Sequence, residues 1–111
     1  PYVIEVSQGL RDLLADAGVA TPVYGSFNEA EEARVARIDA PSLIHAATTL
    51  GQSPDVDAVF LSCTNLRTLD VLPLIAEQTG KPVLSSNQVL IWQMARLAGI
   101  SLDLARFGPA L

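Results

Sequence analysis

The chain has 111 residues, of which 50% are hydrophobic and 17% are charged, a composition typical of one globular domain and not of a disordered segment. Its net charge of -5, with no cluster of Lys or Arg, argues against a nucleic-acid partner because phosphate contacts need concentrated positive charge. One cysteine permits neither an internal disulfide nor a Cys/His zinc site, and no apolar stretch approaches the roughly 20 residues of a membrane span, so we expect a cytoplasmic protein without a metal site or a membrane partner.

The N-terminal third predicts a helix, a strand and a second helix. Apolar side chains recur at steps of three and four over residues 3–17, which is the pattern of one buried helical face, and Gly18 follows as a stop. Residues 21–25 predict a short strand. Residues 26–37 are polar and predict a helix with Asn28 as its N-cap, because acidic residues fill its first turn.

The remainder of the chain alternates helices with short apolar strands. The predicted elements are a helix over 39–50, a strand over 58–62, a helix over 64–78, a strand over 81–85 and a helix over 88–98. Asp39 is expected to cap the first of these helices, and Pro41 fits its first turn. Pro73 is tolerated only in a first turn, so a helix that begins well before Leu69 should bend there.

This order of elements predicts an α/β fold. Helices that alternate with short strands are typical of right-handed βαβ crossovers and a parallel sheet. We therefore expect residues 1–111 to form a single three-layer α/β domain with a short parallel sheet, of the flavodoxin-like kind. The first helix has no strand before it, and Pro1-Tyr2 has the character of a strand end, so we interpret the chain as a fragment of a longer protein.

Cys63 directly follows the predicted strand over 58–62 and precedes the predicted helix over 64–78. In parallel sheets ligands bind at the carboxyl ends of the strands, and the backbone N–H groups of a helix N-terminus favour anions there. Ser85 stands at the end of the next strand, so we expect both side chains near one edge of the sheet. A lone cysteine after a strand is commonly a small buried hydrophobe, so its position alone leaves both interpretations open.

Two segments carry a resemblance to a known family. FLSCTNLR over residues 60–67 and GKPVLSSNQ over residues 80–88 resemble the second half of the aspartate/glutamate racemase superfamily. Within it they are most similar to the branch of maleate cis-trans isomerases, arylmalonate decarboxylases and ectoine-utilisation proteins. The segment 25–38 and Pro1-Tyr2, which resembles a Thr-Pro-Tyr motif, extend the similarity over nearly the whole chain.

The resemblance implies a fold and an incomplete site. Such enzymes consist of two similar α/β domains related by a pseudo-twofold axis, and each domain presents a cysteine or its substitute to the substrate between them. The chain then corresponds to the C-terminal domain, with Cys63 as the catalytic residue and no counterpart of the residue that faces it. The substrate-binding candidates, implied by the resemblance or by their place at strand ends, are Tyr2, Asn28, Thr64, Asn65 and Ser85.

The implied activity is that of a cofactor-independent isomerase or decarboxylase of a small dicarboxylic acid. Cys63 would act as the acid or base of a proton transfer, or as a nucleophile in an isomerase. Asn65 stands where glutamate racemases carry His, which disfavours an amino-acid racemase without excluding it. The alternative from another class is a non-catalytic module that binds small acids or a protein partner. We expect the fragment alone to be inactive and to need the missing N-terminal half or a second copy.

Overall fold

Two short parallel strands form the centre of the domain. Strand β1 (Val59–Leu61) pairs with β2 (Val83–Ser85) so that Phe60 lies opposite Leu84. The computed structural model describes residues 1–103. The helices of this part of the chain are α1 (Ile4–Asp16), α2 (Glu32–Val35), α3 (Ala40–Gly51), α4 (Leu72–Thr79) and α5 (Ser86–Leu97). The predicted α/β fold with a short parallel sheet is confirmed.

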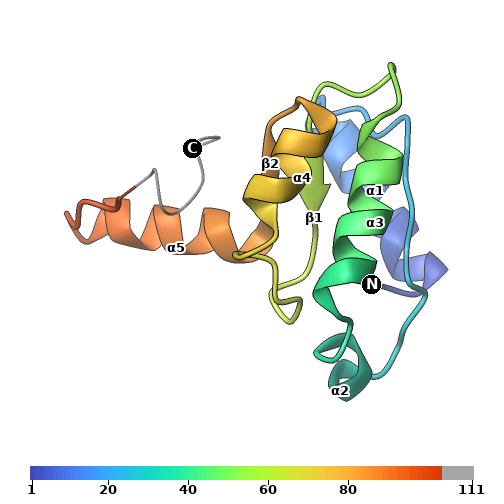
Figure 1. Cartoon of the computed structure of the whole chain (residues 1–111), viewed down its shortest axis with the longest axis horizontal. Helices are drawn as coiled ribbons and strands as arrows, with labels where there is room; N and C mark the ends of the chain where they lie inside the picture. Colours follow the sequence, from blue (N-terminus) through green and yellow to red (C-terminus); the bar gives the residue numbers. More distant parts are fainter. Residues whose placement is uncertain (104–111) are drawn as a thin grey trace.

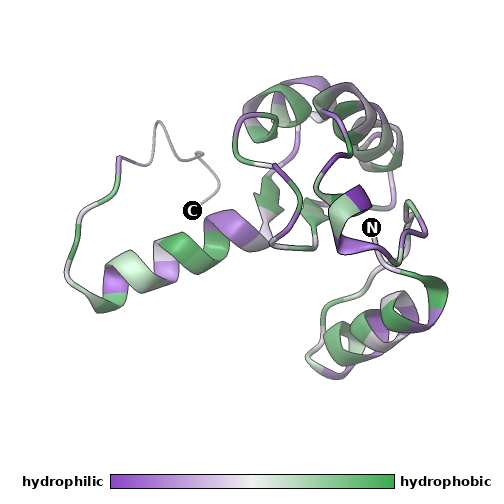
Figure 2. Cartoon of the chain, turned by 90° about the horizontal axis from the view of Figure 1, so that it is seen from below, coloured by the Kyte–Doolittle hydropathy of each residue, from purple (hydrophilic) through white to green (hydrophobic). Residues whose placement is uncertain are grey.

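The helices lie on two sides of the sheet. α3 and α4 pack against each other and against the strands on one side, whereas α1 and α5 lie on the other side, well apart from one another (Figure 2). α5 runs outward from the end of β2, away from the rest of the domain (Figure 1). Phe60 projects from the sheet face opposite to α3 and α4 and is 48% exposed. The α3–α4 pair therefore covers one face of the sheet fully, whereas the opposite face is partly open to solvent.

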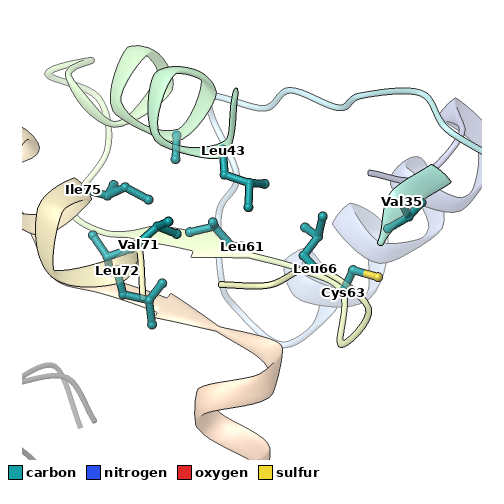
Figure 3. Close-up of a cluster of buried hydrophobic side chains, with 10 residues drawn as sticks. Val35, Leu43, Leu61, Cys63, Leu66, Val71, Leu72 and Ile75 are labelled. Carbon is teal, nitrogen blue, oxygen red and sulfur yellow. The ribbon is translucent and has the colours of Figure 1, made fainter. Parts of the chain in front are cut away.

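The hydrophobic core fills the space between the strands and the α3–α4 pair. Its buried side chains are Val35, Leu43, Ala47, Leu61, Cys63, Leu66, Val71, Leu72, Ile75 and Val83. Cys63 lies at one end of this cluster, and its sulfur points toward the side on which Val35 of α2 lies (Figure 3). The core thus extends from the helical pair to the residues that follow β1.

Several helix ends lie where the sequence predicts them. Asp39 caps α3 by accepting a hydrogen bond from the Ser42 backbone N–H at 2.9 Å, and hydrogen bonds from Ser42 hold the pKa of this carboxyl below its ordinary value. Pro73 lies in the first turn of α4. Gly18 and Gly80 follow α1 and α4 with φ of 82° and 67°, a left-handed conformation that glycine adopts without steric penalty.

The prediction of a strand over residues 21–25 is wrong. These residues belong to no strand. The guanidinium group of Arg11 donates to both the hydroxyl and the carbonyl oxygen of Thr21 at 3.1 Å. The Thr21 carbonyl, which in a strand would accept a backbone N–H of the adjacent strand, is therefore bonded to a side chain of α1. Pro22 supplies no N–H donor. A strand forms only where a partner pairs with it, and apolar pattern alone does not reveal the partner.

Two helices are shorter than predicted. α2 has four residues, and Asn28 does not cap it, because the φ of Asn28 is 50° whereas an N-cap residue is extended. The helix predicted over 64–78 begins only at Leu72. Pro73 accounts for this start, since proline fits the first turn of a helix and disrupts its interior.

Two helices also leave apolar side chains open to solvent. On α1, the predicted buried face is partly uncovered, with Val6 at 52% and Leu13 at 66% exposure, and Ile4 beside it is 68% exposed. On α5, Leu90, Met94 and Leu97 follow one another at helical spacing and are all at least half exposed. We call these three residues the α5 apolar stripe. None of the helices within residues 1–103 combines the length and the apolar character needed to cross a membrane.

Ser85 connects β2, α5 and the loop after β1 through two hydrogen bonds. Its fully buried hydroxyl accepts from the Thr68 hydroxyl at 2.9 Å and from the backbone N–H of Gln88 at 3.3 Å. The second bond caps the N-terminus of α5.

Replacing Ser85 by Ala is expected to lower the free energy of unfolding by about 2–4 kcal/mol, because a lost N-cap is worth about 1 kcal/mol and a buried unsatisfied donor about 1–3 kcal/mol. Urea denaturation followed by circular dichroism measures this change. The exposed Ser101 offers a matched control, and Ser101→Ala should change stability by less than about 0.5 kcal/mol. Equal stability of the two variants would contradict the proposed connection.

Candidate active site

Cys63 has a backbone conformation that residues with a side chain rarely adopt. Its φ is 140°, and holding such a residue in a glycine-favoured region typically costs about 1–3 kcal/mol. Conformations of this kind persist only where the surroundings enforce them, and they cluster at functional sites. The side chain is 7% exposed. The strained backbone makes Cys63 a candidate functional residue.

Three hydrogen bonds fasten the segment after β1 to the junction of β2 and α5. We call the segment over residues 62–68 the Cys63 loop. The three bonds run from Cys63 N to Ser86 Oγ at 3.1 Å, from Thr68 Oγ1 to Ser85 Oγ at 2.9 Å and from Asn87 Nδ2 to Leu66 O at 2.8 Å. Three consecutive polar residues at the end of β2 therefore hold the loop at its beginning, middle and end.

The helix N-terminus beside Cys63 belongs to α5 and not to the helix that follows Cys63 in sequence. Ser86, whose hydroxyl accepts from the Cys63 amide, is the first residue of α5. The prediction that a helix begins at Thr64 is wrong, since α4 begins at Leu72. The expected environment nevertheless exists, because the neighbouring parallel strand ends at the same edge and leads into a helix there. Helix N-termini favour negative charge.

The phenol of Tyr2 lies against this edge of the sheet. Burial raises the pKa of Tyr2 above its ordinary value, and a hydrogen bond with Ser62 opposes that rise. The electrostatic interaction and hydrogen bond with Cys63, and the nearby Glu32 carboxylate, raise it further. Because the pKa is raised, the phenol is protonated near neutral pH and can donate a hydrogen bond. Tyr2 and Cys63 thus place a neutral O–H donor and a thiol side by side.

The backbone around Tyr2 is held from two directions. Ser7 of α1 donates to the Tyr2 carbonyl at 3.3 Å, and Ser26 donates to the same carbonyl. Asn28 follows in the loop over residues 26–29, exposed and with its backbone N–H donated to the Ser26 hydroxyl at 3.0 Å. This loop fixes the position of Tyr2, and Asn28 lies on its solvent side.

Asn65 links the Cys63 loop to α2. Its backbone N–H donates to the Cys63 sulfur at 3.4 Å, and its side-chain amide donates to the Glu32 carbonyl at 2.8 Å and to the Glu32 carboxylate at 2.6 Å. The amide side chain of Asn65 is thus committed to α2, while its backbone faces the thiol. Thr64, between Cys63 and Asn65, is exposed.

The structure brings together some of the residues that the sequence predicts. Tyr2, Cys63 and Asn65 lie in one cluster. Ser85 is fully buried with both of its hydrogen bonds internal, which favours the capping role; its binding of substrate, like that of Asn28 and Thr64, stays a prediction. Within residues 1–103 no group of three or more His, Cys, Asp or Glu side chains is arranged to hold a metal ion.

The cluster contains two further residues: Glu32, which the sequence does not predict as a site residue, and Ser86, which the sequence indicates only as part of the polar run after the strand over 81–85. Ser86 stands at a strand end, and its place in the Ser85–Asn87 polar run is the only signal that points to it. Glu32 lies in a polar helix far from Cys63 in sequence, and no spacing or motif distinguishes it from neighbouring acidic residues. Both are recognisable only once β1, β2 and α2 are assembled.

A thiol and a phenol thus lie together at the carboxyl edge of a parallel sheet in an α/β domain, the arrangement that the resemblance to the aspartate/glutamate racemase superfamily implies. The family model of arylmalonate decarboxylase matches residues 1–108. The chain belongs to the arylmalonate decarboxylase family.

Individual relatives agree with this assignment. Arylmalonate decarboxylase of Bordetella bronchiseptica is 31% identical over 99 residues. Among solved structures, that of arylmalonate decarboxylase superposes with a TM-score of 0.79 at 31% identity, and a double mutant of this enzyme in its liganded form with 0.84 at 30% identity. The unliganded enzyme gives a TM-score of 0.80 at 30% identity.

The similarity covers most of this chain but less than half of each relative. The alignment with the Bordetella enzyme includes 88% of this chain and 41% of that protein. The alignment with the arylmalonate decarboxylase structure covers 88% of this chain and 43% of that one, and the alignment with the liganded double mutant covers 88% and 42%. The alignment with the unliganded enzyme covers 91% of this chain and 44% of that one. The chain therefore spans about two-fifths of the length of the relatives that it matches.

Proposed function

We propose that the full-length protein is a cofactor-independent, cysteine-dependent decarboxylase or isomerase of a small dicarboxylic acid, and that this chain is its C-terminal domain. The observation that carries the proposal is the strained Cys63, with its thiol beside the Tyr2 phenol at the edge of the sheet. Family membership favours decarboxylation of a malonate-type acid over isomerisation.

The chemistry requires one proton and one stabilised negative charge. When the bond between the α-carbon and one carboxylate breaks, CO₂ leaves and the electron pair stays on the α-carbon and the remaining carboxylate as an enediolate. Cys63 Sγ–H then donates its proton to the α-carbon, and the resulting thiolate takes a proton from water. The neutral Tyr2 phenol donates a hydrogen bond to the developing charge, which lowers the barrier because the donor is already in place.

The uncovered apolar side chains support the assignment to a larger protein. The α5 apolar stripe and the exposed side chains of α1 form surfaces of a kind that usually contacts other protein. In the full-length protein these faces pack on the remainder of the polypeptide, which also supplies the residue facing Cys63 across the substrate.

Turnover by the purified full-length protein tests the proposal directly. Phenylmalonate, maleate and L-glutamate are incubated with the protein in the presence of EDTA, and proton NMR and circular dichroism distinguish decarboxylation, isomerisation and racemisation. We expect loss of CO₂ from phenylmalonate or conversion of maleate to fumarate. Racemisation of glutamate alone would assign the other activity of the superfamily, and binding of all three acids without turnover would identify a non-catalytic module.

The chain of residues 1–111 by itself is expected to turn over these substrates at least about 10³-fold more slowly than the full-length protein, because it holds only one wall of the site and loses the positioning of substrate against the opposite wall. The same NMR assay measures this difference. Addition of the separately purified remainder of the protein is the matching control. Turnover by the isolated chain at the full-length rate would contradict the division of the site between two domains.

A further inference from the structure

At the β2–α5 junction, Ser86 is the residue whose side chain forms a hydrogen bond with Cys63. Its hydroxyl accepts from the Cys63 backbone N–H at 3.1 Å. We propose that Ser86 is a positioning residue: it holds Cys63 at its strained φ and thereby sets the direction of the thiol. This inference rests on the proposed function in that it concerns the same cysteine.

The place of Ser86 at the strand end explains why a side chain is needed there. β1 ends at Leu61 and β2 at Ser85, so the ladder of backbone hydrogen bonds between the strands stops two residues before Cys63. Ser86 already belongs to α5, and the carbonyl groups of a helix point along its axis toward the next turn. The Ser86 hydroxyl therefore substitutes for the backbone acceptor that a longer β2 would offer to the Cys63 amide.

The neighbouring polar residues do not perform this task. Ser85 bonds to Thr68, and Asn87 bonds to the carbonyl of Leu66, so they hold the far part of the Cys63 loop. Without the Ser86 bond, the amide of Cys63 would lose its partner in a largely buried place, and the unfavourable φ of 140° could relax. Relaxation turns the Cα–Cβ bond and moves the sulfur away from Tyr2.

Three substitutions in the full-length protein separate the hydroxyl from the shape of the side chain. Ser86→Ala removes the acceptor, Ser86→Thr keeps it, and Ser86→Val has the shape of threonine without the hydroxyl. Since Thr and Val differ only in a hydroxyl for a methyl group, a folding defect that is due to branching affects both. The difference between them then reports on the hydrogen bond to Cys63.

We expect Ser86→Ala and Ser86→Val to lower kcat on phenylmalonate by about 10–100-fold with KM changed less than about threefold, because a misplacement of about 1 Å can reduce a rate by about that much. Ser86→Thr should retain kcat within about threefold of the wild-type value. Amide hydrogen exchange over residues 62–66, followed by mass spectrometry, should be faster in Ser86→Ala and Ser86→Val and unchanged in Ser86→Thr.

Wild-type kcat in Ser86→Val, an equal loss of kcat in Ser86→Thr and Ser86→Val, or unchanged exchange over residues 62–66 in Ser86→Val would each overturn the inference. The exchange measurement needs no substrate. If the wild-type protein turns over none of the three acids, the proposed function fails, whereas the exchange comparison of the Thr and Val variants still decides whether Ser86 holds the Cys63 backbone.

Discussion

Replacing Cys63 by Ser in the full-length protein is expected to lower kcat/KM for the proposed dicarboxylate substrate by about 10³-fold or more. A hydroxyl group is a far weaker acid than a thiol, and a proton donor positioned at the reacting carbon typically contributes about 10²–10⁴-fold. The fold should persist, because serine fits the same space and the hydrogen bond to Ser86 uses the backbone N–H of residue 63. Steady-state kinetics, with the thermal midpoint recorded in parallel, measure both effects.

A second substitution at this position separates the thiol from the strained backbone. Glycine adopts a φ of 140° readily, so Cys63→Gly should be at least as stable as Cys63→Ser and equally inactive. Retention of full activity in Cys63→Ser would eliminate the cysteine-dependent mechanism. Iodoacetamide provides a chemical control, because Cys63 is the sole cysteine of the chain. The fraction of activity lost should equal the fraction of this domain that mass spectrometry shows to be alkylated.

Replacing Tyr2 by Phe is expected to lower kcat/KM by about 10²-fold, because the loss of one preorganised donor to a developing negative charge has about this effect. The ring and its packing against the core remain, so stability near neutral pH should change little. Tyr24→Phe is a matched control: Tyr24 is exposed, and its ring lies 5.2 Å from the Arg11 guanidinium, a contact that phenylalanine preserves. Wild-type activity in Tyr2→Phe would exclude the phenol from the reaction.

The raised pKa of Tyr2 also predicts the sign of an alkaline effect. The folded state holds the phenolic proton more tightly than the unfolded state, whose value is about 10.0, so this contribution to stability is complete below about pH 10 and is lost as the pH rises through the folded-state pKa. Urea denaturation above pH 10 should therefore show a smaller loss of stability in Tyr2→Phe than in the wild-type protein. The same pH dependence in both proteins would show that the environment of Tyr2 does not raise its pKa.

Local sequence signals predict much of the fold correctly. The apolar runs mark β1 and β2, Asp39 caps α3, and Pro73 stands in the first turn of α4. Each of these depends on neighbours within about four residues, where side-chain chemistry and backbone preference act directly. The extents of α2 and α4 are predicted less well, because both helices are shorter than predicted. The residues before each helix have a composition that suits a helix, but tertiary contacts hold them in a loop.

The exposed face of α1 shows a different limit of local pattern. Its apolar periodicity correctly predicts a helix, but periodicity states only that one face prefers burial, and not which element covers it. The same holds for residues 21–25, whose composition suits a strand but where Thr21 accepts hydrogen bonds from the Arg11 side chain. In both cases the outcome depends on a partner surface that the local sequence does not encode.

By itself, the sequence determined the α/β order of elements, the helix caps and the position of Cys63 at a strand end, together with the resemblance that points to its chemistry. The tertiary structure alone decided which groups surround that cysteine. Ser86 lies 23 residues from Cys63 along the chain, and Glu32 lies 33 residues from Asn65. The physical reason is that parallel pairing of β1 with β2 and the packing of α2 bring these residues together, and contacts over such separations follow from the assembled fold and leave no periodic trace in the sequence.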